Sequence, residues 1–209
     1  METDMGLNSL KDVQDMLTDP DNTYRSVPFW GWNAKLKKEE LHRQMQGMKN
    51  QKMGGFFIHS REGLETDYLS EEWMELVKDS VEYAGSQGLE AWIYDEDKWP
   101  SGSAGGMVSA LDPEKFTAKG LTLEILDGKN AGAKEDKRIL RIFRQEGKTL
   151  VFREETSGTS EWYNGMAPTD NLNPDAVKAF LHMTHERYKA ACGEEFGKTV
   201  KGFFTDEPN

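Results

Sequence analysis

Polar and aromatic side chains follow four short apolar segments of the chain, in a combination that suits sugar chemistry. In chain order they are Trp32 and Asn33; His59, Arg61 and Glu62; Asp95, Glu96, Asp97 and Trp99; and Asp206, Glu207 and Asn209. Hydrolysis of a glycosidic bond needs one carboxylic acid to protonate the leaving oxygen, and a second carboxylate to act as nucleophile or to activate water. Tryptophan offers a flat apolar face to the C–H groups of a sugar ring. These residue types therefore predict binding and hydrolysis of a carbohydrate.

The same carboxylates leave a metal site open as an alternative. Asp95, Asp97 and Asp206 carry the hard oxygen ligands that divalent cations prefer. Consecutive strand residues point to opposite faces, so neighbouring acids converge only where the backbone turns. His182 and His185 are about one helical turn apart but lack the glutamate of an HExxH motif, and we interpret them as helix-surface histidines. We expect no cofactor.

Strand-like and helix-like segments alternate along the chain and would position these side chains. Four apolar segments are typical of buried parallel strands, at residues 29–33, 53–59, 89–94 and 200–205. A helical pattern covers residues 37–51, and a second begins at a Ser70 cap and stops at Gly88. A third helix should begin at Asn173-Pro174 and bury a stripe formed by Val177, Phe180, Leu181, Thr184 and Tyr188. Repeated strand–helix units favour a parallel sheet.

Between the third and fourth strands the pattern changes to short alternating segments, at residues 121–125, 139–143 and 149–153. Turns at Asp127-Gly128 and Glu146-Gly147 would join them. We interpret residues 118–156 as a small antiparallel β insertion, and residues 1–27 as an N-terminal leader segment with a helix. Residues 28–209 then hold four of the eight units of a barrel that takes about 250 residues. The predicted fold is α/β, the N-terminal half of a (β/α)8 TIM-type barrel with its functional residues at the strand ends.

Composition and charge exclude several classes of partner. The formal net charge of −11 and the pI near 4.9 disfavour nucleic acid, which clustered Lys and Arg bind. The sequence has neither a signal-peptide core nor a run of about 18 apolar residues, so we expect no membrane partner and a cytoplasmic location. Cys192 is the only cysteine and forms no internal disulfide. We interpret it as a small core residue.

Three motifs at successive strand ends resemble a known group of enzymes. They are Pro28-Phe29-Trp30-Gly31-Trp32-Asn33; Trp92-Ile93-Tyr94-Asp95-Glu96 with Trp99-Pro100-Ser101-Gly102 and Gly105-Gly106; and Gly202-Phe203-Phe204-Thr205-Asp206-Glu207-Pro208. From about Pro28 onward the chain is similar to the barrel of bacterial glycoside hydrolases related to the alpha-L-rhamnosidase type. In this large group of barrel glycosidases, the acid/base glutamate ends the fourth strand in an Asn-Glu-Pro motif.

The resemblance implies that Glu207 is the general acid and that the partner carboxylate lies on a later strand. The chain has Asp206 where the motif has asparagine. We expect the sugar to be held by the polar and aromatic residues at the strand ends, namely Trp32, Asn33, His59, Arg61, Asp95, Glu96, Trp99 and Asp206.

The sequence thus predicts a glycoside hydrolase that acts on a poly- or oligosaccharide. One alternative is a carbohydrate-binding barrel domain without turnover. The other is a metal-dependent barrel hydrolase or isomerase with Asp95, Asp97 and Asp206 as ligands. The unpaired strand edges of a half barrel should pair with the remainder of the barrel or with another copy, and half a barrel alone should be inactive.

Overall fold

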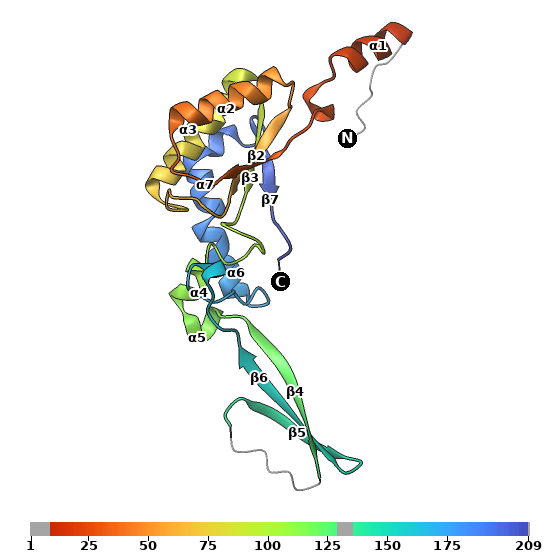
Figure 1. The fold of residues 1–209 in the computed structure, drawn as a ribbon, viewed down its shortest axis with the longest axis vertical. Coiled ribbons are helices and arrows are strands. Elements are labelled where there is room, and N and C mark those ends of the chain that lie inside the picture. The colour runs from red at the N-terminus through yellow and green to blue at the C-terminus, as the bar shows by residue number, and fades with distance from the viewer. Residues whose placement is uncertain (1–8, 129–135, 209) are drawn as a thin grey trace. The chain divides into compact units, whose positions relative to one another are not determined.

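The computed structural model describes residues 9–128 and 136–208, which fall into two compact units (Figure 1). The first unit comprises the described residues up to Trp99 together with His182–Asp206, and the second comprises Pro100–Leu181 and the residues after Asp206. The first contains a parallel sheet and the second a separate antiparallel sheet, so the fold is mixed α/β. Within the described ranges, no helix is long and apolar enough to cross a bilayer.

Four parallel strands form the sheet of the first unit. They are adjacent in the order β1 (Phe29–Trp32), β2 (Gly55–Ser60), β3 (Glu90–Tyr94) and β7 (Val200–Phe204). These are the four strands predicted from the sequence, in the order that the first four strands of a barrel would take. The parallel sheet is therefore confirmed, and the complete barrel remains a prediction.

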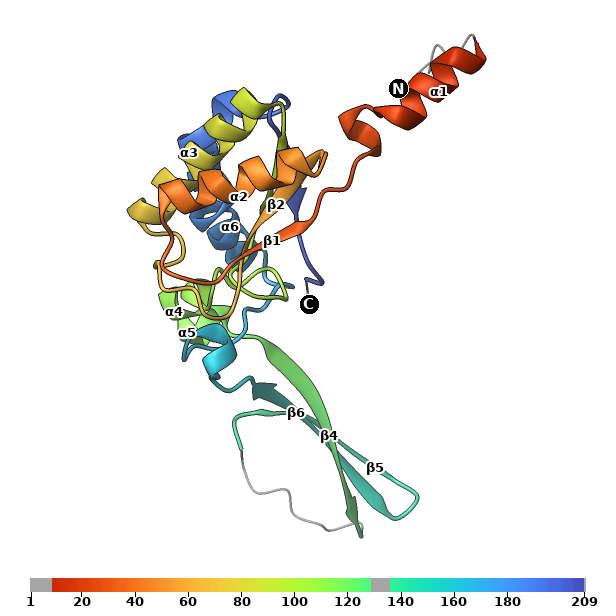
Figure 2. The ribbon, with the colours of Figure 1, turned by 45° about the horizontal axis from the view of Figure 1, so that its top comes forward.

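The helices of this unit include α2 (Lys38–Asn50), α3 (Glu71–Gln87) and α7 (His185–Cys192), with α3 in contact with both of the others (Figures 1 and 2). As predicted, α3 begins at Ser70, whose Oγ accepts a hydrogen bond from the Trp73 backbone N–H at 3.1 Å. It ends at Gly88 in the left-handed conformation, with a φ of 70°. The unit also contains α1 (Leu10–Thr18), which is the predicted leader helix, and the 3-10 turns η1 (Asn22–Tyr24) and η3 (Gly193–Glu195).

The two faces of the parallel sheet differ in their side chains. One face contributes apolar residues to the core, namely Trp30, Trp32, Phe56, Ile58, Ala91 and Ile93. The other, which we call the aromatic face, carries Phe29, Phe57, His59, Trp92, Tyr94 and Phe204, linked by ring contacts. Gly202 lies under this face, where a Cβ would be 2.9 Å from Cζ3 of Trp92.

The parallel sheet curves strongly around its aromatic face. The rings of Phe29 on β1 and Phe204 on β7 have centroids 5.1 Å apart, although β2 and β3 lie between their strands. A flat sheet would separate the outer two of four strands by roughly 14 Å. Curvature of this kind is what closure into a barrel requires.

The predicted third helix is interrupted. It starts at Pro174 as expected, with Asn173 Oδ1 accepting from the Asp175 N–H at 3.0 Å, but α6 (Pro174–Met183) stops before Thr184 and α7 begins at His185. Thr184 has φ −109° and ψ −80°, which are not helical values, and this turns the following residues toward the sheet. Thr184 and Tyr188 are buried as predicted, whereas Leu181 is 42% exposed, so its place in the buried stripe was wrong.

The second unit contains the predicted antiparallel insertion. Its strands lie in the order β4 (Lys119–Asp127), β6 (Lys148–Thr156) and β5 (Ile139–Gln145), and the predicted turn Glu146-Gly147 joins β5 to β6. The other predicted turn, Asp127-Gly128, leads into residues 129–135, which lie outside the described residues. The unit also contains α4 (Met107–Leu111), α5 (Pro113–Phe116), most of α6 and the 3-10 turn η2 (Glu161–Tyr163).

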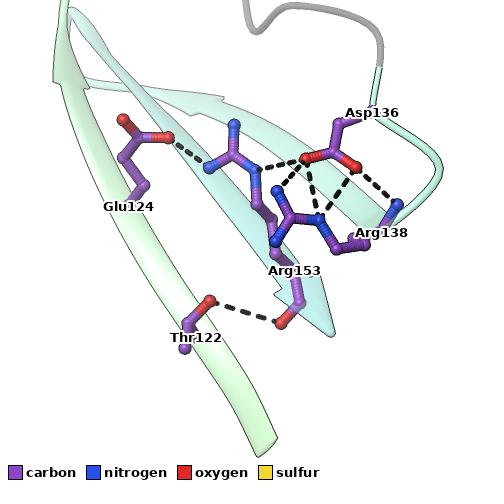
Figure 3. A network of polar contacts seen from close by, with 5 residues as sticks. All are labelled: Thr122, Glu124, Asp136, Arg138 and Arg153. Atoms are coloured by element: carbon purple, nitrogen blue, oxygen red, sulfur yellow. Dashed lines mark hydrogen bonds and ion pairs between the residues drawn. The ribbon is translucent and has the colours of Figure 1, made fainter. Parts of the chain in front are cut away.

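This antiparallel sheet has one polar face and one apolar face. On the polar face Arg153 pairs with Glu124 and Asp136, and Arg138 also pairs with Asp136 (Figure 3). Hydrogen bonds from Arg138 lower the pKa of Asp136 to about 2. The apolar face presents exposed side chains in cross-strand register, including Leu121, Leu123, Ile125 and Phe143.

Candidate functional site

The carboxyl ends of β2, β3 and β7 bring most of the predicted site residues together. Because the three strands are parallel neighbours, the residues that follow them leave the sheet at the same edge. At this edge lie His59 to Arg61 from β2, Asp95 to Trp99 from β3, and Thr205 and Asp206 from β7. We refer to these residues as the edge cluster.

Asp95 is held inside the first unit by a hydrogen bond from Thr205 and a longer contact with His185. It is fully buried, and its Oδ2 accepts a hydrogen bond from Thr205 Oγ1 at 2.6 Å. The Nε2 atom of His185 lies 3.6 Å from the same oxygen, and the His185 ring packs on Phe203 at 4.3 Å. Burial lowers the pKa of His185. The prediction that His185 is a surface histidine was therefore wrong, because the break at Thr184 turns it toward Asp95.

The next two acids are also buried and hydrogen-bonded. Ser60 Oγ donates to Asp97 Oδ1 at 2.5 Å, and Lys98 Nζ lies 3.5 Å from Asp97 Oδ2. Glu96 Oε1 accepts from the backbone N–H of Asp97 at 2.9 Å. This burial favours a role in positioning the strand ends over direct contact with a sugar, the role predicted for Asp95 and Glu96. Among residues 9–128 and 136–208, no three His, Cys, Asp or Glu side chains form a metal-binding group.

Asp206 is joined to the aromatic face through Tyr94. The Tyr94 hydroxyl donates to Asp206 Oδ2 at 2.7 Å. Its ring is stacked between His59, at a centroid distance of 3.7 Å and an interplanar angle of 17°, and Phe204, at 5.8 Å and 14°. Burial and the hydrogen bond to Asp206 raise the pKa of Tyr94, so the hydroxyl stays protonated and keeps donating. Asp206, which is only half-buried, is thereby fixed in orientation.

His59 is the polar member of this stack. Its side chain is 6% exposed, and its Nε2 atom is buried without a hydrogen-bond partner among the described residues. Burial, followed by the charge of Arg61, lowers its pKa to about 4, and the charges of Asp206 and Asp97 act in the opposite direction. The imidazole is therefore neutral at pH 7, and a neutral imidazole has one ring nitrogen that can accept a hydrogen bond.

Arg61 and Trp99 complete the edge cluster. The guanidinium carbon of Arg61 lies 4.9 Å from the centroid of the Trp99 ring, which is cation–π geometry. Trp99 is 36% exposed and Arg61 is half-buried. Both predicted side chains are thus accessible at the sheet edge.

The remaining predicted site residues are not members of the edge cluster. Trp32 is 1% exposed and packs edge-on against Trp30 and Trp73, which makes it a core residue and removes it from the candidate site. Asn33 and Glu62 are exposed just beyond β1 and β2. Glu207 is exposed and has a φ of 44°, a value that non-glycine residues seldom adopt. Asn209 lies outside the described residues.

Sequence reasoning missed four residues of the edge cluster and its supports, namely Ser60, Tyr94, His185 and Thr205. A signal existed for Tyr94, because it follows Trp92 with the strand period of two and directly precedes the acidic run. The hydroxyl residues Ser60 and Thr205 also end their strands beside predicted site residues. Their partners, however, are on other strands and depend on the register.

The titration of His59 gives a direct test of this geometry. We expect the Hε1 resonance of His59 to titrate with a midpoint near pH 4 in NMR spectra, because the buried ring disfavours the charged form. Arg61→Gln should raise the midpoint and Asp206→Asn should lower it, since these charges act in opposite directions. A midpoint near that of a free histidine, about 6.5, in all three proteins would contradict the burial of His59.

The same shift predicts a pH dependence of stability. The folded-state pKa of His59 is lower than its unfolded value, so the unfolded chain binds more protons between pH 6.5 and about 4. The contribution of His59 should therefore be fully present above pH 6.5 and fall as the pH decreases through that window. Urea titrations at several pH values, compared with His59→Gln, would isolate it.

Comparison with known proteins gives distant structural similarity and no match in sequence. The chain matches no protein-family model and no curated protein. Among solved structures, the rhamnosidase from Novosphingobium sp. PP1Y aligns with a TM-score of 0.40 and 18% sequence identity. The alignment covers 61% of this chain and 12% of that one, so the chain spans a small part of the rhamnosidase's length. A similarity this low assigns neither a family nor an activity.

Proposed function

We propose that this chain carries part of the active site of a glycoside hydrolase, with the edge cluster binding the sugar and Glu207 acting as general acid. The observation that carries the proposal is the oriented group Asp206–Tyr94–His59 at the carboxyl edge of a curved parallel sheet. In barrel enzymes the functional residues lie at this edge. Glu207 directly follows Asp206 in the sequence.

The chemistry assigned to each group follows from its surroundings. A carboxylate accepts up to about four hydrogen bonds, so Asp206 can accept from a sugar hydroxyl as well as from Tyr94. His59 presents a neutral ring nitrogen to a second hydroxyl, and Trp99 offers an exposed aromatic face. Glu207 would donate its proton to the glycosidic oxygen as the bond to the leaving group breaks.

Carbohydrate binding without hydrolysis is the second candidate function, and one observation favours it. Hydrolysis needs two carboxyl groups that can reach the substrate, whereas the three acids that follow β3 are buried and hydrogen-bonded. They are poorly placed to supply the second carboxylate. In the hydrolase proposal that group comes from a later strand, on the remainder of a (β/α)8 barrel.

A panel of aryl glycosides, rhamnosides included, separates these two functions. We expect release of the aryl group from at least one member of the panel by the protein that carries this chain, and the reactive glycoside identifies the sugar. Saturation-transfer NMR with the corresponding methyl glycosides measures binding independently. Binding of a sugar without turnover of any aryl glycoside would replace the hydrolase proposal by the binding function, and loss of both would reject each.

A further inference from the structure

We propose that Arg61 binds the carboxylate of an acidic sugar, so that the edge cluster selects a substrate containing a uronic acid. This inference rests on the proposed carbohydrate function and names the class of sugar that the same site prefers.

The backbone and side chain of Arg61 are held in place by neighbouring residues. Its guanidinium forms no ion pair within the described parts of the chain. Its backbone N–H donates to Trp32 O at 3.1 Å, which extends the β1–β2 pairing beyond the strand. Its side chain crosses Gly31, where a Cβ would lie 3.2 Å from Arg61 Cγ. Within residues 9–128 and 136–208 no carboxylate oxygen lies within 4.0 Å of its guanidinium nitrogens.

Four other arginines in this acidic chain have carboxylate partners. The chain has 37 Asp and Glu against 26 Lys and Arg, so carboxylates outnumber cations. Arg25, Arg43, Arg138 and Arg153 all form ion pairs with Asp or Glu. Arg61 is half-buried at a candidate site, lies against an aromatic ring and has no such partner in the described residues, which suits it to an external anion.

Trp99 and His59 define how such an anion would bind. A guanidinium that lies over an aromatic ring keeps its N–H groups in its own plane, where they can form two parallel hydrogen bonds with a planar carboxylate. His59 lies on β2, and Arg61 follows two residues later, just past the end of the strand. The Nε2 atom of His59 is buried without a partner in the described residues. A uronic acid offers both a carboxylate for Arg61 and ring hydroxyls for His59.

The test compares sugars that differ only at C6. Dissociation constants of methyl β-D-glucuronide and methyl β-D-glucoside, and of methyl α-D-galacturonide and methyl α-D-galactoside, would be measured by NMR titration of the protein. We expect at least one uronide to bind about 10-fold or more tightly than its neutral counterpart, as a charge-assisted hydrogen-bond pair provides. Added salt should reduce this preference.

Variants assign the preference to Arg61. Arg61→Gln should remove it, and Arg61→Lys should retain part of it because the charge remains without the planar fork. Arg43→Gln is the matched control, since it removes the same charge from the exposed surface of α2 and should leave the preference unchanged. Circular dichroism would verify that each variant is folded.

The outcomes separate this inference from the proposed function. Equal affinity for uronide and neutral glycoside, or a preference that survives Arg61→Gln, would overturn the role of Arg61. If neutral aryl glycosides are hydrolysed in that case, the proposed function stands. Absence of both binding and hydrolysis for every sugar would overturn the inference and the proposed function together.

Discussion

Glu207→Gln is expected to reduce kcat on the reactive glycoside by about 10²- to 10⁴-fold, which is the usual contribution of a general acid. Glutamine keeps the shape of the side chain but has no acidic proton to give to the leaving oxygen. The loss should be largest for alkyl leaving groups, which must be protonated, and smallest for activated aryl groups such as 2,4-dinitrophenolate. Affinity for the sugar should change little, because the lost interaction belongs to the transition state.

Asp206→Asn is the matched control for this experiment. It removes a neighbouring carboxylate and introduces the asparagine of the motif that the sequence resembles, but it leaves the Glu207 carboxyl in place. Its effect should be smaller and should include weaker sugar binding, because the hydrogen bond from Tyr94 is no longer charge-assisted. Equal losses in the two variants, with no dependence on the leaving group, would contradict the assignment of Glu207 as acid.

Trp73→Ala should destabilise the first unit by about 3–5 kcal/mol, the usual cost of removing a large buried aromatic side chain. Trp73 is fully buried, with ring centroids 5.0 Å from Trp32 and 5.1 Å from Tyr68. Its Nε1 donates to the Tyr188 hydroxyl at 3.1 Å, so the substitution also leaves a buried hydroxyl without its donor. Urea unfolding followed by circular dichroism would measure the loss.

Trp99→Ala provides the comparison, because it removes the same side chain from a partly exposed position. Its effect on the free energy of unfolding should be within roughly 1 kcal/mol, the range of substitutions away from the core. Trp73→Phe should fall between the two, since it keeps most of the ring volume and loses the N–H. A similar cost for Trp73→Ala and Trp99→Ala would mean that the core is not where the structure places it.

Much of the first unit could be predicted because its signals are local. The four strands are apolar segments of strand length, and the limits of α3 follow from a serine that caps its first turn and a glycine that adopts positive φ at its end. The antiparallel insertion follows from alternation and from the Glu146-Gly147 turn. Each of these features depends on residues within one or two turns of one another, and a single sequence contains that information.

The contacts of the edge cluster could not be predicted, because they join residues that are distant in sequence. Tyr94 and Asp206 are 112 positions apart, and Thr205 and Asp95 are 110 apart. Their pairing depends on the register between β3 and β7, which shifts at an irregularity between Ala91 and Trp92. A one-residue change in that register would move every side chain of β7 to the opposite face. No local sequence pattern indicates which register the two strands adopt.

Trp32 illustrates a different limit. The alternation of side chains along a strand places Trp30 and Trp32 on the same face of β1. It does not show whether that face packs against the helices or belongs to the aromatic face. The structure places both in the core and leaves Gly31 beneath Arg61 on the other side. The break at Thr184 is similar, since the helical pattern continues across it and only contacts with Phe203 and Asp95 show where His185 turns.

The close approach of Gly202 to Trp92 restricts the order in which these two residues can be substituted. A Cβ at position 202 would lie 2.9 Å from the indole ring of Trp92, so alanine there requires the ring to move or a smaller residue to replace Trp92. If Trp92 is replaced first, a cavity is left beside Gly202, which lowers stability without creating a steric clash. Substitution of Trp92 should therefore precede substitution of Gly202. The double variant Trp92→Leu/Gly202→Ala should be more stable than the sum of its single substitutions indicates.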